Sequence, residues 1–205
     1  MIQLQNLTIE TRHPIVRNIH YTFQLGKIYG IVSENGSGKT TLFRTMVHLI
    51  DPKEGKILFD GKPVESCLKD VFYFEDVEWL DGNLKGEDYI AFVKKMWDSK
   101  ADIKPVIQAL NMEEYIRIPI KKYSLGMKQK LIIGMYLISD ATYLIMDEIT
   151  NGLDDQNRKR FFEILKEWKK RNKTILLSSH YKDEISEFCD IVLQIRGKKL
   201  KEVNV

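Results

Sequence analysis

Hydrophobic residues along this chain recur with two spacings, one typical of strands and one typical of helices. Alternating apolar positions at 2–9 and 19–23 predict two strands of a small antiparallel sheet at the N-terminus, joined through a turn at 12–14. Continuous apolar runs at 28–32 and 142–146 are typical of strands buried in a parallel sheet. Shorter segments predict further strands at 56–60, 71–74, 173–178, 191–195 and 198–203.

Helical spacing dominates from about residue 77 to residue 139, where no predicted strand interrupts it. Helices are predicted over 86–97 and 102–110, and Ser124 is placed to cap the start of a third helix. That helix is expected to carry its apolar residues on one face, namely Leu131, Ile132, Met135 and Tyr136. Outside this stretch, the same spacing predicts helices at 40–50 and 155–171.

Together these elements predict an α/β fold with a single domain over residues 1–205. We expect a mostly parallel sheet in its core and a small antiparallel β subdomain at the N-terminus. The helical stretch at about 77–139 is then a lobe inserted between strands of that core.

A glycine-rich loop joins the strand at 28–32 to the next helix, and residues 30–42 are Gly-Ile-Val-Ser-Glu-Asn-Gly-Ser-Gly-Lys-Thr-Thr-Leu. Backbone N–H groups of such a loop point inward around a phosphate, and the positive end of the helix dipole adds to their field. Lys39 is expected to reach the β- and γ-phosphates of a nucleotide, and the Thr40 hydroxyl to ligate Mg²⁺. The loop therefore predicts the core of a P-loop NTPase.

One position departs from the pattern G-x-x-x-x-G-K-[ST], because Ser33 stands where a glycine is usual. We expect Ser33 to tune nucleotide affinity without abolishing it. An ordinary strand–turn–helix is the alternative, but turn chemistry alone does not require a lysine and a threonine directly after the glycines. The predicted nucleotide-binding residues of the loop are Ser33, Glu34, Asn35, Gly36, Ser37, Gly38, Lys39, Thr40 and Thr41.

The apolar strand at 142–146 ends in two acids, Asp147 and Glu148. Such a strand sets its first carboxylate beside the phosphate-loop strand, where it can hold Mg²⁺ directly or through water. The second carboxylate lies just beyond the strand and can polarise an attacking water. A pair of surface acids at a strand end is the alternative, and the phosphate loop upstream favours the catalytic interpretation.

Composition narrows the class of protein. With 205 residues, 43% of them hydrophobic and 30% charged, the chain is typical of a soluble globular protein. A net charge of +3 is too small to indicate a nucleic-acid partner, and none is expected. Cys67 and Cys189 lack metal or redox spacing and are expected to be reduced thiols. No signal peptide is visible in residues 1–13 and no apolar run approaches a membrane span, so we expect a chain that does not itself cross a membrane.

Five motifs, taken in order, resemble those of the ATP-binding subunit of an ATP-binding cassette (ABC) transporter, and the similarity covers essentially the whole chain. The phosphate loop comes first. Residues 123–129, Tyr-Ser-Leu-Gly-Met-Lys-Gln, match the family signature, usually Leu-Ser-Gly-Gly-Gln, and keep its serine and second glycine. The acid pair at 147–148 matches the metal-binding acid and the catalytic glutamate. Residues 151–154 match the loop that crosses the dimer interface, and His180 matches the switch histidine.

The resemblance implies an ATPase that uses ATP and Mg²⁺. Its catalytic residues would be Lys39, Glu148 and His180. Two subunits would bind ATP head to tail, with Ser124 and Gly126 of one facing the γ-phosphate held by the other and with Asp154 also at the interface. The second subunit would be another copy of this chain or a related cassette.

The resemblance also implies a separate integral membrane permease as partner, and a position in the cytoplasm, peripheral to the cytoplasmic face of the cell membrane. The signature variant and the short C-terminus are similar to those of bacterial exporters of drugs, peptide antibiotics or lantibiotics. An ABC-type assembly ATPase of the iron–sulfur scaffold type, soluble and without a membrane partner, is the alternative. The cleft near residues 75–84 is the expected docking surface, and Trp79 and Leu80 are either its apolar anchors or part of the core.

Two departures from the family pattern concern the nucleotide site. The glutamine usual after the aromatic strand is replaced, and Glu75 is the best match for it, with Asp76 as the alternative; we expect Glu75 to contact the metal. The aromatic residue that stacks on adenine is missing, so Arg12 or His13 stacks instead, or this segment is a simple turn.

Overall fold

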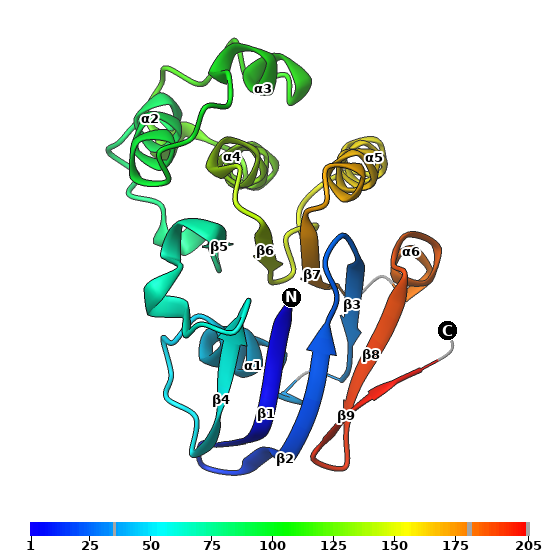
Figure 1. The fold of residues 1–205 in the computed structure, drawn as a ribbon. Helices are drawn as coiled ribbons and strands as arrows, with labels where there is room; N and C mark the ends of the chain where they lie inside the picture. Colours follow the sequence, from blue (N-terminus) through cyan, green and yellow to red (C-terminus); the bar gives the residue numbers. More distant parts are fainter. Residues whose placement is uncertain (35, 180–181, 204–205) are drawn as a thin grey trace.

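The computed structural model of the chain describes residues 1–34, 36–179 and 182–203. Its main sheet has six strands in the order β5-β6-β7-β3-β8-β9 (Figure 1). Five of them run parallel, namely β5 (Val71–Tyr73), β6 (Tyr143–Met146), β7 (Thr174–Ser178), β3 (Ile28–Val32) and β8 (Ile191–Arg196). The edge strand β9 (Lys199–Glu202) is antiparallel to β8. This arrangement confirms the predicted α/β fold with a mostly parallel sheet.

A separate three-stranded sheet in the order β2-β1-β4 is antiparallel, as predicted for the N-terminus. Its strands are β1 (Ile2–Glu10), β2 (Pro14–Phe23) and β4 (Glu54–Phe59). Helix α1 (Lys39–Met46) lies between the two sheets. Its Leu42 and Phe43 belong to one hydrophobic cluster with residues of β1 and with Tyr29 of β3.

Alternate residues of β3 serve different cores, because successive side chains of a strand point to opposite faces. Tyr29 and Ile31 face α1, whereas Ile28 and Val32 pack with the helices of the other face. Those helices are α4 (Leu125–Ser139), α5 (Asp155–Lys170) and α6 (Lys182–Phe188). Gly30 lets α6 approach the sheet, since a Cβ there would lie 2.5 Å from a side-chain carbon of Ile185.

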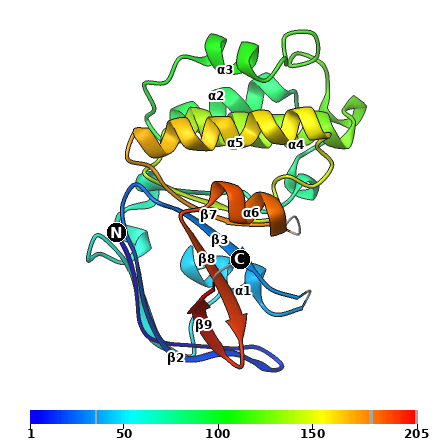
Figure 2. The same ribbon diagram turned by 90° about the vertical axis from the view of Figure 1, so that its right-hand side faces the viewer.

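The chain between β5 and β6 is helical. It contains α2 (Gly86–Met96), α3 (Ile103–Ala109) and α4, which gather at the end of the molecule opposite the small sheet (Figures 1 and 2). Ser124 caps α4 as predicted, accepting a hydrogen bond from the backbone N–H of Met127 at 3.3 Å. Among the residues that the structure describes, short 3₁₀ turns lie at Val64–Ser66, Leu68–Asp70, Val77–Trp79 and Ile120–Lys122.

Two local predictions were wrong and one helix was missed. Helix α1 ends at Met46 rather than near residue 50, because His48 adopts a left-handed φ of 60° that stops the helix. Helix α4 does not bury a single face, since it packs against α2, α3 and β5 and its buried residues surround the axis. Helix α6 was not predicted at all; it has seven residues, too few for a clear periodic pattern.

No helix within the described ranges has the length and hydrophobicity that crossing a membrane requires.

Candidate functional site

The phosphate loop leads from the end of β3 into the start of α1, and its backbone demands glycine at two positions. Gly36 and Gly38 have φ values of 77° and 99°, in the left-handed region that side chains disfavour. A Cβ at Gly38 would also lie 2.3 Å from Cγ2 of Ile15, on the neighbouring small sheet. Asn35, another predicted loop residue, lies outside the described residues.

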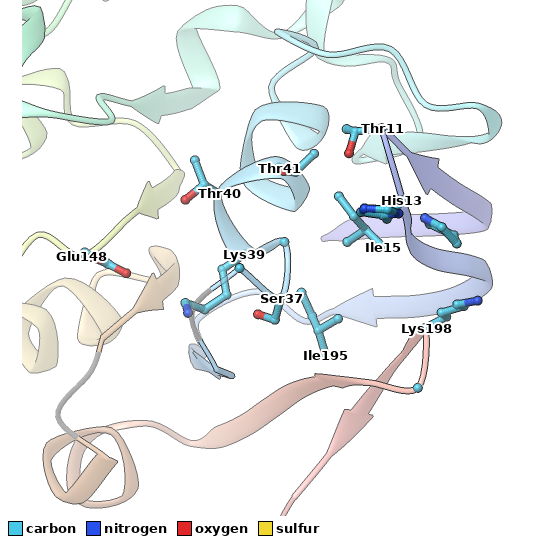
Figure 3. A pocket seen from close by; sticks show the side chains of 14 residues that line it. Thr11, His13, Ile15, Ser37, Lys39, Thr40, Thr41, Glu148, Ile195 and Lys198 are labelled. Atoms are coloured by element: carbon cyan, nitrogen blue, oxygen red, sulfur yellow. The ribbon is translucent and has the colours of Figure 1, made fainter.

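This loop forms the floor of a cavity of about 720 Å³. Figure 3 shows Glu148 at one end, Lys39 and Thr40 in the middle, and His13 beside Ile15 at the other end. Of the two residues considered for stacking on the base, His13 lines this cavity. The full lining is Thr11, His13, Pro14, Ile15, Gly36, Ser37, Gly38, Lys39, Thr40, Thr41, Glu148, Ile195, Gly197 and Lys198.

Two polar side chains of the loop fit an oxyanion. The Lys39 side chain is only 6% exposed, and its ammonium donates to the carbonyl oxygen of Ser33 at 3.0 Å. The hydroxyl of Ser37 is buried and has no hydrogen-bond partner within the part of the chain that the structure describes. A phosphate oxygen would satisfy this hydroxyl and would give Lys39 a charged partner.

Ser33 has a role that the sequence did not reveal. Its hydroxyl donates to the carbonyl of Val32 and accepts a hydrogen bond from the backbone N–H of Ile195 at 2.9 Å. The side chain thereby joins the end of β3 to β8 just before the loop begins. A glycine at this position has no side chain for such a contact.

Asp147 lies beside the start of α1, within hydrogen-bond reach of Thr40. The sequence predicted that its strand would lie beside the phosphate-loop strand, but β7 separates β6 from β3 in the sheet. Its two carboxylate oxygens accept hydrogen bonds from the hydroxyls of Thr40 and Ser178. Burial raises the pKa of Asp147, and the two hydroxyls oppose that rise. The sequence did not single out Ser178, although the register between β6 and β7, which pairs Met146 with Leu177, brings it next to Asp147.

Ser178 also positions Glu148. Its Oγ accepts a hydrogen bond from the backbone N–H of Glu148 at 3.0 Å, so one serine holds both members of the acid pair. The backbone of Glu148 has a φ of 48°, which turns the chain sharply after β6, and Asn151 donates to its carboxylate at 2.9 Å. His180, the predicted switch histidine, lies outside the described residues.

Oxygen atoms line a second cavity of about 250 Å³ next to the first. Thr40, Asp147, Glu148 and Glu75 contribute to its wall, and the buried Oε1 of Gln129 has no hydrogen-bond partner within the described ranges. Hard oxygen donors of this kind suit Mg²⁺, which takes one or two carboxylates and completes its shell with phosphate and water. No cluster of three or more His, Cys, Asp or Glu side chains forms a metal cage among the described residues, so the nucleotide would supply the remaining ligands.

Glu75 is held tightly by two neighbours. Arg44 of α1 donates hydrogen bonds to both carboxylate oxygens of Glu75, from Nε to Oε2 and from Nη2 to Oε1. The hydroxyl of Tyr73 donates to Oε2 at 2.7 Å. Arg44, followed by Tyr73, holds the pKa of Glu75 below its usual value. Asp76 instead accepts a hydrogen bond from the backbone N–H of Glu78 and caps the 3₁₀ turn there.

The signature residues do not join the phosphate cavity of their own chain. Ser124 and Gly126 lie at the start of α4. Gly126 is close to the backbone of Gly152, since a Cβ added at Gly126 would lie 3.2 Å from the carbonyl oxygen of Gly152. Asp154 caps α5, accepting a hydrogen bond from the backbone N–H of Asn157 at 2.8 Å. None of these three predicted interface residues lines the cavity at the phosphate loop.

Comparisons with known proteins agree on one family. A model described as ABC transporter matches residues 16–151. The chain is 36% identical over 211 residues to the uncharacterized ABC transporter ATP-binding protein YybJ of Bacillus subtilis (strain 168), covering 98% of this chain and 95% of that protein. It is 31% identical over 192 residues to the ABC transporter ATP-binding protein NatA of the same organism, covering 89% and 78%.

A further relative supports the same family, and a solved structure shows the same fold. The lantibiotic transport ATP-binding protein SrtF of Streptococcus pyogenes is 31% identical over 195 residues, covering 94% of this chain and 85% of that protein. A solved structure described as the ATP binding subunit of an ABC transporter superposes with a TM-score of 0.91 at 20% identity, covering 100% of this chain and 90% of the other.

Proposed function

The chain belongs to the ATP-binding proteins of ABC transporters, which are ATPases coupled to transport, and on that premise we propose that it drives a separate membrane permease that exports a drug, a peptide or a lantibiotic. The observation that carries the proposal is the convergence of the phosphate loop and the acid pair on adjoining cavities, with Thr40 hydrogen-bonded to Asp147.

Each residue of the site has a separate role in ATP hydrolysis. Lys39 exchanges the Ser33 carbonyl for oxygens of the β- and γ-phosphates, and the loop N–H groups surround the same charge. Thr40 and Asp147 would hold Mg²⁺, which neutralises negative charge on the phosphates when bound. Glu148 accepts a proton from the attacking water, and His180 hydrogen-bonds the γ-phosphate. Rate enhancement then comes mainly from positioning and from stabilisation of charge.

The site is completed by a second subunit. Ser124 and Gly126 lie at the N-terminus of α4, a 15-residue helix, where free N–H groups and the helix dipole favour an anion. Because neither residue lines the cavity at the phosphate loop of its own chain, we propose that both face the γ-phosphate bound by a partner. Asp154 lies at the same interface. The partner is a second copy of this chain or a related cassette.

An apolar groove of about 330 Å³ is the proposed docking surface for the permease. Trp79 lines it and is 45% exposed, and the exposed side chains of Leu49, Leu68 and Met96 surround it. Leu80, the other predicted anchor, is 7% exposed and belongs to the core. Contiguous exposed apolar side chains favour a protein partner, and we propose the permease as that partner.

The transported class rests on relatives. SrtF is named a lantibiotic transport protein, and we extend export of a drug, peptide or lantibiotic to this chain by that similarity. Attachment to a permease would place the chain at the cytoplasmic face of the cell membrane. Co-purification from detergent extracts with a membrane protein encoded beside this chain would support the transporter, whereas co-purification with iron–sulfur proteins alone would support the assembly ATPase.

Glu148→Gln tests the catalytic assignment. The amide keeps the shape of the side chain but cannot accept the proton, so hydrolysis should fall by roughly 100-fold or more while ATP still binds. Size-exclusion chromatography with ATP should then show a stable dimer. Glu167→Gln is the matched control, because Glu167 is an exposed acid of α5 that forms an ion pair with Lys170. A Glu148→Gln protein with full ATPase activity would refute the role of Glu148.

A further inference from the structure

Three carboxylates line one small cavity next to the phosphate loop, where the γ-phosphate is expected. Glu75, Asp147 and Glu148 all line the cavity of about 250 Å³. Both Glu148 and Glu75 act on Asp147 by charge repulsion, which adds to the rise of its pKa. ATP brings further negative charge to the same place. An acid at position 75, where the family usually has a neutral glutamine, therefore needs compensation.

Arg44 supplies a positive charge at the required distance and angle. It is the basic residue of the last turn of α1, on the helix that begins at the phosphate loop. Its planar guanidinium meets the carboxylate of Glu75 with two parallel hydrogen bonds, the arrangement that arginine forms best. The side chain of Glu75 is 11% exposed and that of Arg44 is 41% exposed, so solvent screens the acid only weakly.

Tyr73 completes the set of donors. Its hydroxyl donates to Oε2 of Glu75, an oxygen that also accepts from Nε of Arg44. With these three hydrogen bonds, both carboxylate oxygens are directed toward Arg44 and Tyr73. The ring of Tyr73 packs edge-on against Trp79 and lines the apolar groove, so its position is fixed from the other side as well.

We propose that Arg44 is a positioning residue that clamps Glu75 and cancels its charge, so that the pair takes the place of a neutral amide beside the nucleotide. Glu75 then acts through Arg44 rather than as a ligand of Mg²⁺. This inference rests on the proposed ATPase function. It gives opposite signs for the two single substitutions, because Arg44→Gln leaves an uncompensated negative charge near ATP and Glu75→Gln leaves an uncompensated positive charge.

The test measures the dissociation constant of ATP in EDTA and low salt, with a fluorescent ATP analogue, so that no metal contributes. Arg44→Gln should weaken binding roughly threefold to tenfold, and Glu75→Gln should tighten it by a similar factor, as expected for one unit charge at close range in a partly screened site. The double variant should return to within about twofold of the parent, and Arg44→Lys should restore most of the affinity.

Other outcomes have distinct meanings. If both single variants weaken binding, or neither changes it, the clamp is refuted, and a lower thermal midpoint alone would mark the pair as merely structural. If Glu75→Gln changes only the Mg²⁺ concentration needed for hydrolysis, Glu75 is a metal ligand and the inference is wrong. Arg160→Gln and Glu163→Gln, an exposed ion pair of α5 away from both cavities, are the matched controls. Failure of the parent protein to bind or hydrolyse ATP would instead refute the proposed function.

Discussion

Ser178→Ala is the most informative single substitution at the site, because one hydroxyl holds both members of the acid pair. The hydroxyl donates to Asp147 and accepts from the backbone N–H of Glu148 at 3.0 Å, and Ser178 is fully buried. Alanine removes only this oxygen. The change therefore leaves the core packing almost intact and tests hydrogen bonding alone.

The structure gives the size of the effect. Losing a hydrogen bond to a charged group costs about 1.5–3 kcal/mol, and losing an acceptor for a partly buried N–H adds about 1 kcal/mol. We therefore expect the free energy of unfolding to fall by about 2.5–4 kcal/mol. Loosening of both acids should also lower kcat by roughly 10- to 100-fold. Because the Ser178 hydroxyl lowers the pKa of Asp147, its removal should raise that pKa, and protons should displace Mg²⁺ at a higher pH than in the parent protein.

Urea unfolding and Mg²⁺-dependent phosphate release, measured across pH, check both effects. Ser139→Ala is a matched control, because Ser139 is also buried and its hydroxyl also makes one donated and one accepted hydrogen bond. These bonds join it to the carbonyl of Tyr136 and the N–H of Ala141, away from the acid pair. The control should lose stability without losing turnover per folded molecule. If Ser178→Ala retains the parent kcat and pH profile, Ser178 does not position the acids.

Three further substitutions test neighbouring features. Ser33→Gly should change ATP affinity by less than about tenfold, or about 1.4 kcal/mol. The same substitution should lower the urea midpoint, because the N–H of Ile195 loses its acceptor. A larger change of affinity in a binding titration would contradict the first expectation. Gly38→Ala should reduce ATP affinity by at least roughly tenfold, since φ is 99° and the new Cβ meets a side-chain carbon at 2.3 Å; unchanged binding would show that the loop relaxes easily. Arg44→Gln should lower the free energy of unfolding at neutral pH, and this deficit relative to the parent should disappear on acidification. The folded-state pKa of Glu75 is lowered, so the ion pair stabilises the fold at a pH above 4.5, the reference pKa of a glutamate, and this contribution is lost as pH falls through the folded pKa. A deficit independent of pH in chemical unfolding would exclude the ion pair as its source.

Contiguous motifs were the features that could be predicted from the sequence. The glycine-rich loop, the acid pair after β6 and the cap at Ser124 each depend on residues within a few positions of one another, so their local pattern is sufficient. The same holds for strands with strong apolar runs. Helix ends were less predictable: α1 stops at Met46 although apolar residues continue to Ile50, because a left-handed residue intervenes and no residue-type rule requires it.

The family, the ATPase chemistry and the order of the main strands and helices other than α6 therefore follow from the sequence by itself. The contacts that organise the site were decided by the tertiary structure. Ser178 reaches Asp147 through the register of two parallel strands, and Arg44 meets Glu75 across 31 residues of chain. Exposure of Trp79 and burial of Leu80, adjacent in sequence, likewise depend on what packs around them. A hydrogen bond between distant residues requires the strands and helices to be assembled first, and neither partner carries a local signal of the other.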